Sequence, residues 1–198
     1  MTAPPDRWAT APSTAARFSR TYVTTTTNSN RALAALNAMP SGEAEAELLK
    51  CCGSRAWARR LIAERPFADL DDLIAKSERV WWSLPPDDWL EAFHSHPKIG
   101  EQKAAAKVAA AARQWSADEQ SGIRHAAQQI VDALAQLNTE YEAKFGYIFI
   151  VCASGKSSEE MLAILRERLG NELGEELRNA AAEQAKITQL RLRKLLNA

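Results

Sequence analysis

The chain holds a histidine at a place where a helical segment must end. His96 comes directly before Pro97, which cannot continue a helix and keeps the residue before it out of the α region. The helical pattern of residues 89–93 should therefore stop near Ser95 and leave His96 at a helix end. An imidazole in that place can face a cleft and exchange a proton near neutral pH, so His96 is a candidate acid/base residue.

A serine and a glutamate stand three residues apart further along the chain. Ser116 can cap the backbone amides of a following helix, and Glu119 then occupies the third helical position, which is the capping-box pattern. This pattern is common and usually only structural, and a histidine before proline is more often a turn residue than a catalyst. Neither motif assigns a function alone, so a functional interpretation depends on the neighbouring segments.

Those segments form a set that resembles a known family. Its four blocks follow one another with plausible spacing, and a weaker match at residues 36–40 opens the series. The blocks are His96–Glu101, Trp115–Ser116 with Glu119–Gln120, Phe145–Tyr147 with Phe149–Cys152, and Ala185–Ile187 with Leu190–Leu192. They resemble the decarboxylases of 2-oxo-4-hydroxy-4-carboxy-5-ureidoimidazoline (OHCU), which complete the conversion of urate to allantoin. The likeness covers about residues 36–196, and as a set it is specific.

The resemblance implies a site and a reaction. His96 takes the place of the family's catalytic histidine, and Glu119 is the matched carboxylate, which can orient the imidazole or the ureido group. The reaction needs no cofactor, because the conjugated ring of the substrate accepts the electrons left when carbon dioxide departs. Protonation on one face in a closed site would give (S)-allantoin. The matched substrate-binding positions are Pro97, Ser116, Gln120, Phe149, Ile150, Val151, Cys152, Ala153 and Arg191.

Three of these matches suggest particular contacts. The primary amide of Gln120 suits a ureido group, because it both donates and accepts hydrogen bonds. An extended backbone at residues 149–153 would offer unpaired amides and carbonyls to the ring, while apolar side chains exclude water. Arg191 can hold an anionic or carbonyl oxygen with a forked donor pair, although Arg193 lies only two residues away and is an alternative.

The helical signals predict an all-α fold, a single compact bundle of about eight helices. Tyr147–Cys152 reads as one short extended segment across the core, because an isolated strand cannot make a sheet. Residues 1–30 are expected to form an extended or mobile arm, and residues 31–198 the OHCU decarboxylase-like domain. Helices are expected at residues 43–51, 56–65, 69–81, 103–113, 117–144, 157–169 and 175–196, and a short one carries residues 89–93.

Composition narrows the classes of partner. The 25 basic residues balance 25 acidic ones, so nothing indicates a general attraction to nucleic acid or to an anionic membrane. The three cysteines have no ligand spacing, which favours a reduced cytosolic environment over disulfides or a metal. No segment reaches the length needed to span a bilayer. Cytoplasmic localisation is the default expectation.

Other motifs in the chain suggest other classes of protein. Gly155–Ser157 lacks the upstream glycine of a phosphate-binding loop, since Ile150 stands there. A metal hydrolase using His94, His96 and His125 would need further ligands. A helical interaction module that lost its chemistry remains the alternative function. The resemblance implies a homodimer, for which the helices with Trp57, Trp81 and Trp82 offer surfaces.

Overall fold

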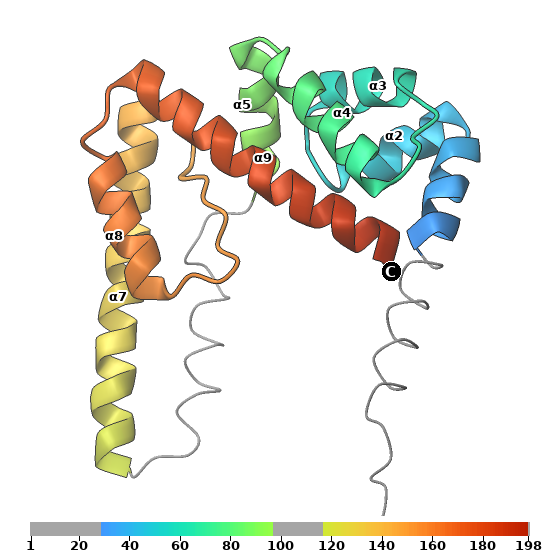
Figure 1. Ribbon diagram of the computed structural model, residues 1–198. Coiled ribbons are helices and arrows are strands. Elements are labelled where there is room, and N and C mark those ends of the chain that lie inside the picture. The colour runs from blue at the N-terminus through green and yellow to red at the C-terminus, as the bar shows by residue number, and fades with distance from the viewer. Residues whose placement is uncertain (1–28, 97–116, 198) are drawn as a thin grey trace, which may run out of the picture.

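The computed structural model describes residues 29–96 and 117–197, and every regular element within these ranges is a helix (Figure 1). Residues 29–38 form a first helical stretch. The other helices are α2 (Ser41–Leu49), α3 (Arg55–Ala63), α4 (Leu70–Trp82), α5 (Pro86–His94), α7 (Ala117–Phe145), α8 (Ser158–Arg168) and α9 (Leu173–Asn197). The all-α prediction is confirmed. Most of the expected arm and the alanine-rich helix at 103–113 lie outside the described residues.

Local capping explains where these helices begin and end. The Asp69 carboxylate accepts a hydrogen bond from the Asp72 amide at 2.8 Å and starts α4. Ser157 and Glu160 form a complete capping box at the start of α8. Pro86 occupies the first turn of α5, where its missing N–H costs nothing. Gly146, with φ of +81°, follows the end of α7.

Helix α9 crosses the molecule and joins its two parts. In Figure 1, α2 to α5 gather along one stretch of α9, while α7 and α8 pack where α9 begins. The indole nitrogen of Trp81 in α4 donates to the Ala181 carbonyl of α9 at 3.0 Å. The Trp89 indole of α5 donates in turn to the Trp81 carbonyl at 3.0 Å. The tryptophans therefore fix α4 and α5 against α9.

This packing corrects one expectation about surfaces. Trp57 and Trp81 have exposed fractions of 0% and 2%, so they belong to the core and offer no surface to a second subunit. Large indoles are buried here because their N–H groups find carbonyl partners. Only Trp82 of the three is exposed, at 44%. In the described part of the chain, no helix is long and apolar enough to cross a membrane.

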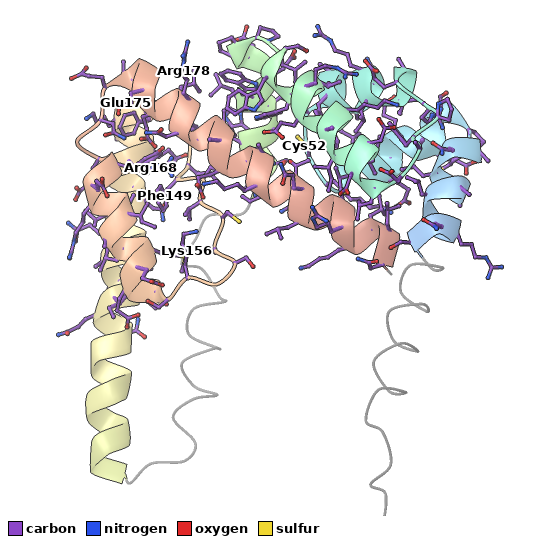
Figure 2. All side chains as sticks on the ribbon, viewed as in Figure 1. Cys52, Phe149, Lys156, Arg168, Glu175 and Arg178 are labelled. Carbon is purple, nitrogen blue, oxygen red and sulfur yellow. The ribbon has the colours of Figure 1, made fainter. Side chains whose placement is uncertain are left out.

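A buried ion pair anchors the segment between α7 and α8. Residues 146–157 contain no helix, as predicted for 147–152. The Arg168 Nε donates to Glu176 Oε1 at 2.7 Å, and its Nη1 donates to the Ile150 carbonyl at 2.8 Å. The Tyr141 hydroxyl also donates to Glu176, and the Arg168 guanidinium lies over the Phe149 ring at 4.8 Å (Figure 2). One carboxylate thus ties together α7, α8, α9 and the extended segment.

Replacing Glu176 by glutamine should destabilise the fold strongly. The amide keeps the shape but leaves the buried Arg168 charge uncompensated, so the free energy of unfolding should fall by about 3–5 kcal/mol. Urea denaturation followed by circular dichroism measures it. The neighbouring Glu175→Gln, at an exposed position of α9, should change stability by less than about 0.5 kcal/mol. Equal effects of the two substitutions would contradict the role of the ion pair.

Candidate active site

His96 lies just beyond the end of α5, where the sequence places it. The helix ends at His94 with Ser95 as its cap, and the His96 amide still donates to the Phe93 carbonyl at 3.1 Å. The Ser95 hydroxyl donates to the Ala92 carbonyl at 2.7 Å. Phe93 is fully buried, which fixes the last turn in the core. The half-buried imidazole of His96 is therefore held on a rigid helix end.

The loop before α3 packs directly against this turn. A Cβ atom on Gly53 would lie 2.2 Å from the Ser95 Oγ and 2.3 Å from the Ser95 Cβ, so only glycine permits the contact. Ser54, the next residue, caps α3 by accepting from the Trp57 amide at 3.2 Å. The position of His96 therefore depends on a close approach between two loops that are distant in sequence.

One face of α9 completes the cluster around His96. Gln184, Thr188 and Arg191 are spaced by four and three residues, so they share a face of the helix. The Arg191 Nη1 donates to the Cys51 carbonyl at 3.3 Å, which links α9 to the loop that supports Ser95. Gln184 is completely buried, and Thr188 is nearly so. Helix α9 thus brings an amide, a hydroxyl and a cation to the histidine.

The surroundings of His96 lower the pKa of its imidazole. Burial is the largest cause, and the positive charge of Arg191 adds to it, while the Gln184 side chain acts in the opposite direction. The ring is therefore neutral at pH 7. Its Nε2 is buried and has no hydrogen-bond partner among the described residues. A neutral imidazole of this kind can take up a proton from a bound ligand and return it.

Arg191 carries a charge that nothing nearby neutralises. Within the described ranges it forms no ion pair with a carboxylate, and its hydrogen bond goes to a carbonyl. The adjacent thiols cannot compensate for it, because burial raises the pKa of both Cys51 and Cys52 to about 11. Arg193, the alternative arginine of the sequence, is exposed. Of the two, Arg191 is placed to attract an anion toward His96.

The segment 149–153 is buried except for Ala153. The Ile150 carbonyl accepts from Arg168 Nη1 at 2.8 Å. The Cys152 amide donates to Glu183 Oε2 at 2.7 Å, and the Cys152 carbonyl accepts from Lys156 Nζ at 2.7 Å. The expectation of unpaired backbone groups is therefore wrong for these three groups. Charged side chains satisfy them, as buried backbone requires, and two of the three, Arg168 and Glu183, are distant in sequence.

A cavity of about 200 Å³ adjoins this segment. Its lining comes from α8, α9 and the loop between α7 and α8, and includes Val151, Lys156, Arg168, Glu183 and Lys186. Neither His96 nor Arg191 belongs to the lining. The cavity is thus a neighbour of the His96 cluster and not its centre.

The structure brings together some of the sequence-predicted residues and leaves others undescribed. His96 and Arg191 lie close enough to interact electrostatically. Pro97 and Ser116 fall outside the described residues. Glu119 and Gln120 belong to the first turn of α7, in a part where side chains are not described. The same holds for the His125 side chain, while the His94 ring is exposed and pairs with the Leu90 carbonyl of its own helix.

Three residues of this cluster were not predicted from the sequence. Gly53 carries no turn motif, and its role follows only from the nearness of Ser95. Gln184 and Thr188 lie among the polar residues of a long helix. Their spacing of four residues, and of three from Thr188 to Arg191, was the one available signal that they share a face. In the part of the chain that is described, no three His, Cys, Asp or Glu side chains are grouped to hold a metal ion.

Comparisons with known proteins point to a single family. Residues 37–193 match the family model described as OHCU decarboxylase. The uric acid degradation bifunctional protein of Arabidopsis thaliana is 37% identical over 161 residues, 81% of this chain and 49% of that protein. The 2-oxo-4-hydroxy-4-carboxy-5-ureidoimidazoline decarboxylase of Amia calva is 33% identical over 67% of this chain and 75% of its own length. The chain thus spans about half of the first relative and three quarters of the second.

Solved structures agree with these relatives. A crystal structure of OHCU decarboxylase in the presence of (S)-allantoin has a TM-score of 0.63 at 37% identity, and the alignment covers 77% of this chain and 98% of that chain. A crystal structure of (S)-allantoin synthase has a TM-score of 0.58 at 18% identity, which shows a shared fold.

Substituting alanine for Gly53 should disturb the turn that holds His96. The new Cβ collides with the Ser95 side chain, so the free energy of unfolding should fall by about 1–3 kcal/mol and the His96 ring resonances should shift. Denaturant titration and NMR of the histidine rings measure both. Gly174→Ala, where an added Cβ meets nothing within 4 Å, is the control and should change neither. Unchanged His96 resonances in Gly53→Ala would show that the contact does not position the ring.

Proposed function

The chain belongs to the OHCU decarboxylase family, and from this premise we propose that it converts 2-oxo-4-hydroxy-4-carboxy-5-ureidoimidazoline to (S)-allantoin and carbon dioxide. This is the last step of urate degradation to allantoin. The observation that carries the proposal is a half-buried His96, kept neutral by its surroundings, beside Arg191, whose charge no carboxylate of the described residues pairs. Such a pair suits an anionic substrate that must exchange protons.

The reaction requires the protein to orient the substrate and to control the transfer of protons. The bond between the ring and the carboxylate breaks, and its electron pair moves into the conjugated ring as carbon dioxide leaves. The hydroxyl group then gives up its proton as it becomes a carbonyl, and the neighbouring carbon gains one. The ring nitrogen that received the electron pair also takes up a proton, so that, counted from the ionised substrate, one proton is consumed for each carbon dioxide released. A single positioned base can take the hydroxyl proton and supply a proton to the carbon.

We assign these tasks to the residues that match the family. His96 moves the proton, and Arg191 holds an anionic or carbonyl oxygen of the substrate by charge-assisted hydrogen bonds. Glu119 orients the imidazole or the ureido group, and Gln120 pairs with the ureido group. Pro97, Ser116 and the segment 149–153 complete the substrate contacts. At Ile150 and Cys152 this contact falls to the apolar side chains, because their bonded backbone groups are already paired.

The family likeness also supports a cofactor-free reaction and a homodimer. A cytoplasmic location remains the default proposal, supported by three cysteines that are free in the structure. Trp82 is the exposed tryptophan that remains available to a dimer surface. The alternative is a helical interaction module without catalysis, and an activity assay separates the two functions directly.

Circular dichroism of allantoin formed from freshly generated substrate tests the function. The protein should produce one enantiomer faster than the spontaneous reaction does, and His96→Ala should lower kcat by about 10²–10⁴-fold because the acid/base group is lost. His94→Ala removes an exposed histidine two positions away and should leave the rate unchanged. A wild-type rate no greater than the spontaneous rate would reject the enzyme and favour the interaction module.

Arg191→Gln should affect both binding and pH dependence. Loss of a charge-assisted contact should raise KM by about 10-fold to 100-fold. Loss of the positive charge should also raise the pKa of His96 toward its ordinary value. Because the neutral ring of the free enzyme is the active base, the acidic limb of the kcat/KM profile should then move to higher pH.

The exposed Arg193→Gln is the matched control, and it should change neither KM nor the position of the acidic limb. The reverse result, a raised KM only in Arg193→Gln, would move the anion-binding role to Arg193. Steady-state rates between pH 5 and 8 provide both readouts.

A further inference from the structure

We infer that Gln184 is a positioning residue that sets the tautomer of His96: its side-chain oxygen accepts the Nε2 proton of the neutral ring. The lone pair is then on Nδ1, which becomes the nitrogen that exchanges the proton with the substrate. This inference deepens the proposed function and rests on it for the reaction, but the tautomer itself can be tested without substrate.

The orientation of the Gln184 amide follows from its neighbour Thr188. The Thr188 hydroxyl donates its single proton to the Gln184 backbone carbonyl at 2.9 Å. It can therefore only accept from the Gln184 side chain, and the amide nitrogen lies 3.2 Å away. A flipped amide would place two acceptors against each other. The Gln184 oxygen must consequently point away from Thr188.

Gln184 is therefore held by Thr188 on one side of its amide. Its oxygen, on the other side, is buried and has no hydrogen-bond partner among the described residues.

The free side of Gln184 meets the buried side of His96. Gln184 Oε1 and His96 Nε2 are both buried, and neither has a hydrogen-bond partner among the described residues. Helix α5, which ends two residues before His96, packs against α9, and the Gln184 side chain acts on the ring in the direction that favours its protonated form. A buried amide oxygen and a buried ring nitrogen can form a hydrogen bond with each other only when the nitrogen carries a hydrogen atom. The geometry therefore selects the Nε2–H tautomer.

The tautomer matters because the ring is neutral. Burial and the charge of Arg191 both disfavour a second proton on the imidazole. A neutral ring has one basic nitrogen, and an acceptor that holds the other nitrogen decides which one it is. Among the described residues, Arg191 on α9 is the charged group that acts on the ring, while the Cys51 and Cys52 thiols remain neutral over the working pH range. Gln184 thus presents Nδ1 as the base.

NMR of the full chain labelled with ¹⁵N-histidine gives the test, with the His96 signals assigned by their loss in His96→Gln. The wild-type ring should be protonated at Nε2 at pH 7. Gln184→Met keeps the length of the side chain but removes the acceptor, so it should mix the two tautomers and lower the pKa of His96. Gln184→Glu keeps an acceptor and adds a negative charge, so it should retain the Nε2–H tautomer and raise that pKa.

Opposite shifts in the two variants distinguish positioning from packing, which would not depend on the charge of residue 184. Gln189→Met, a half-buried neighbour on α9, is the matched control and should change neither tautomer nor pKa. In the decarboxylation assay, Gln184→Met should lower kcat by about 10-fold to 100-fold with little change in KM, less than the loss of His96 itself.

A wild-type ring that is unprotonated at Nε2 would overturn the inference, as would an unchanged tautomer and pKa in Gln184→Met. If Gln184→Met does not fold, as its far-ultraviolet circular dichroism would reveal, the wild-type tautomer and the pKa in Gln184→Glu still decide. A wild-type protein without activity but with the Nε2–H tautomer would reject the proposed function and leave the assignment of the tautomer standing.

Discussion

The buried ion pair between Arg168 and Glu176 is the constraint on which the rest of the structure depends. Glu176 is completely buried, so its charge must be compensated inside the protein. It receives hydrogen bonds from Arg168, from the Tyr141 hydroxyl and from the Asn171 amide. Arg168 in turn holds the Ile150 carbonyl. The non-helical segment between α7 and α8 is thereby fixed to three helices, although it has no ladder of its own.

Helix α9 transmits this constraint to the cluster around His96. Glu176 lies near its beginning, and Glu183, about two turns further on, receives the Cys152 amide. Gln184, Thr188 and Arg191 lie on another face of the same helix. Arg191 reaches the Cys51 carbonyl, next to the loop that supports Ser95. A single rigid helix therefore sets the distance between the buried extended segment and the histidine.

The sequence predicts the helices well because the residues that start and end each helix are close to it in the chain. Pro86, Asp69, Ser157 and Gly146 act on neighbouring amides and carbonyls, so a reader of the chain can place them within a few residues. The cluster around His96 is different, because its members meet only in three dimensions. Nothing near Gly53 in sequence indicates Ser95. The wrong expectation about free backbone groups at Ile150 and Cys152 has the same origin, since Arg168 and Glu183, which pair with two of these groups, come from α8 and α9.

The buried Arg168 and the half-buried Arg191 show how the same type of side chain can serve stability or binding. Arg168 donates hydrogen bonds to a carboxylate, a hydroxyl and a carbonyl, so its charge is compensated within the fold. Arg191 has a carbonyl partner and, in the described residues, no carboxylate. It also lowers the pKa of His96, an arrangement that adds nothing to the stability of the free protein. A cation beside a neutral imidazole becomes favourable once an anion enters, and an acidic substrate supplies that anion.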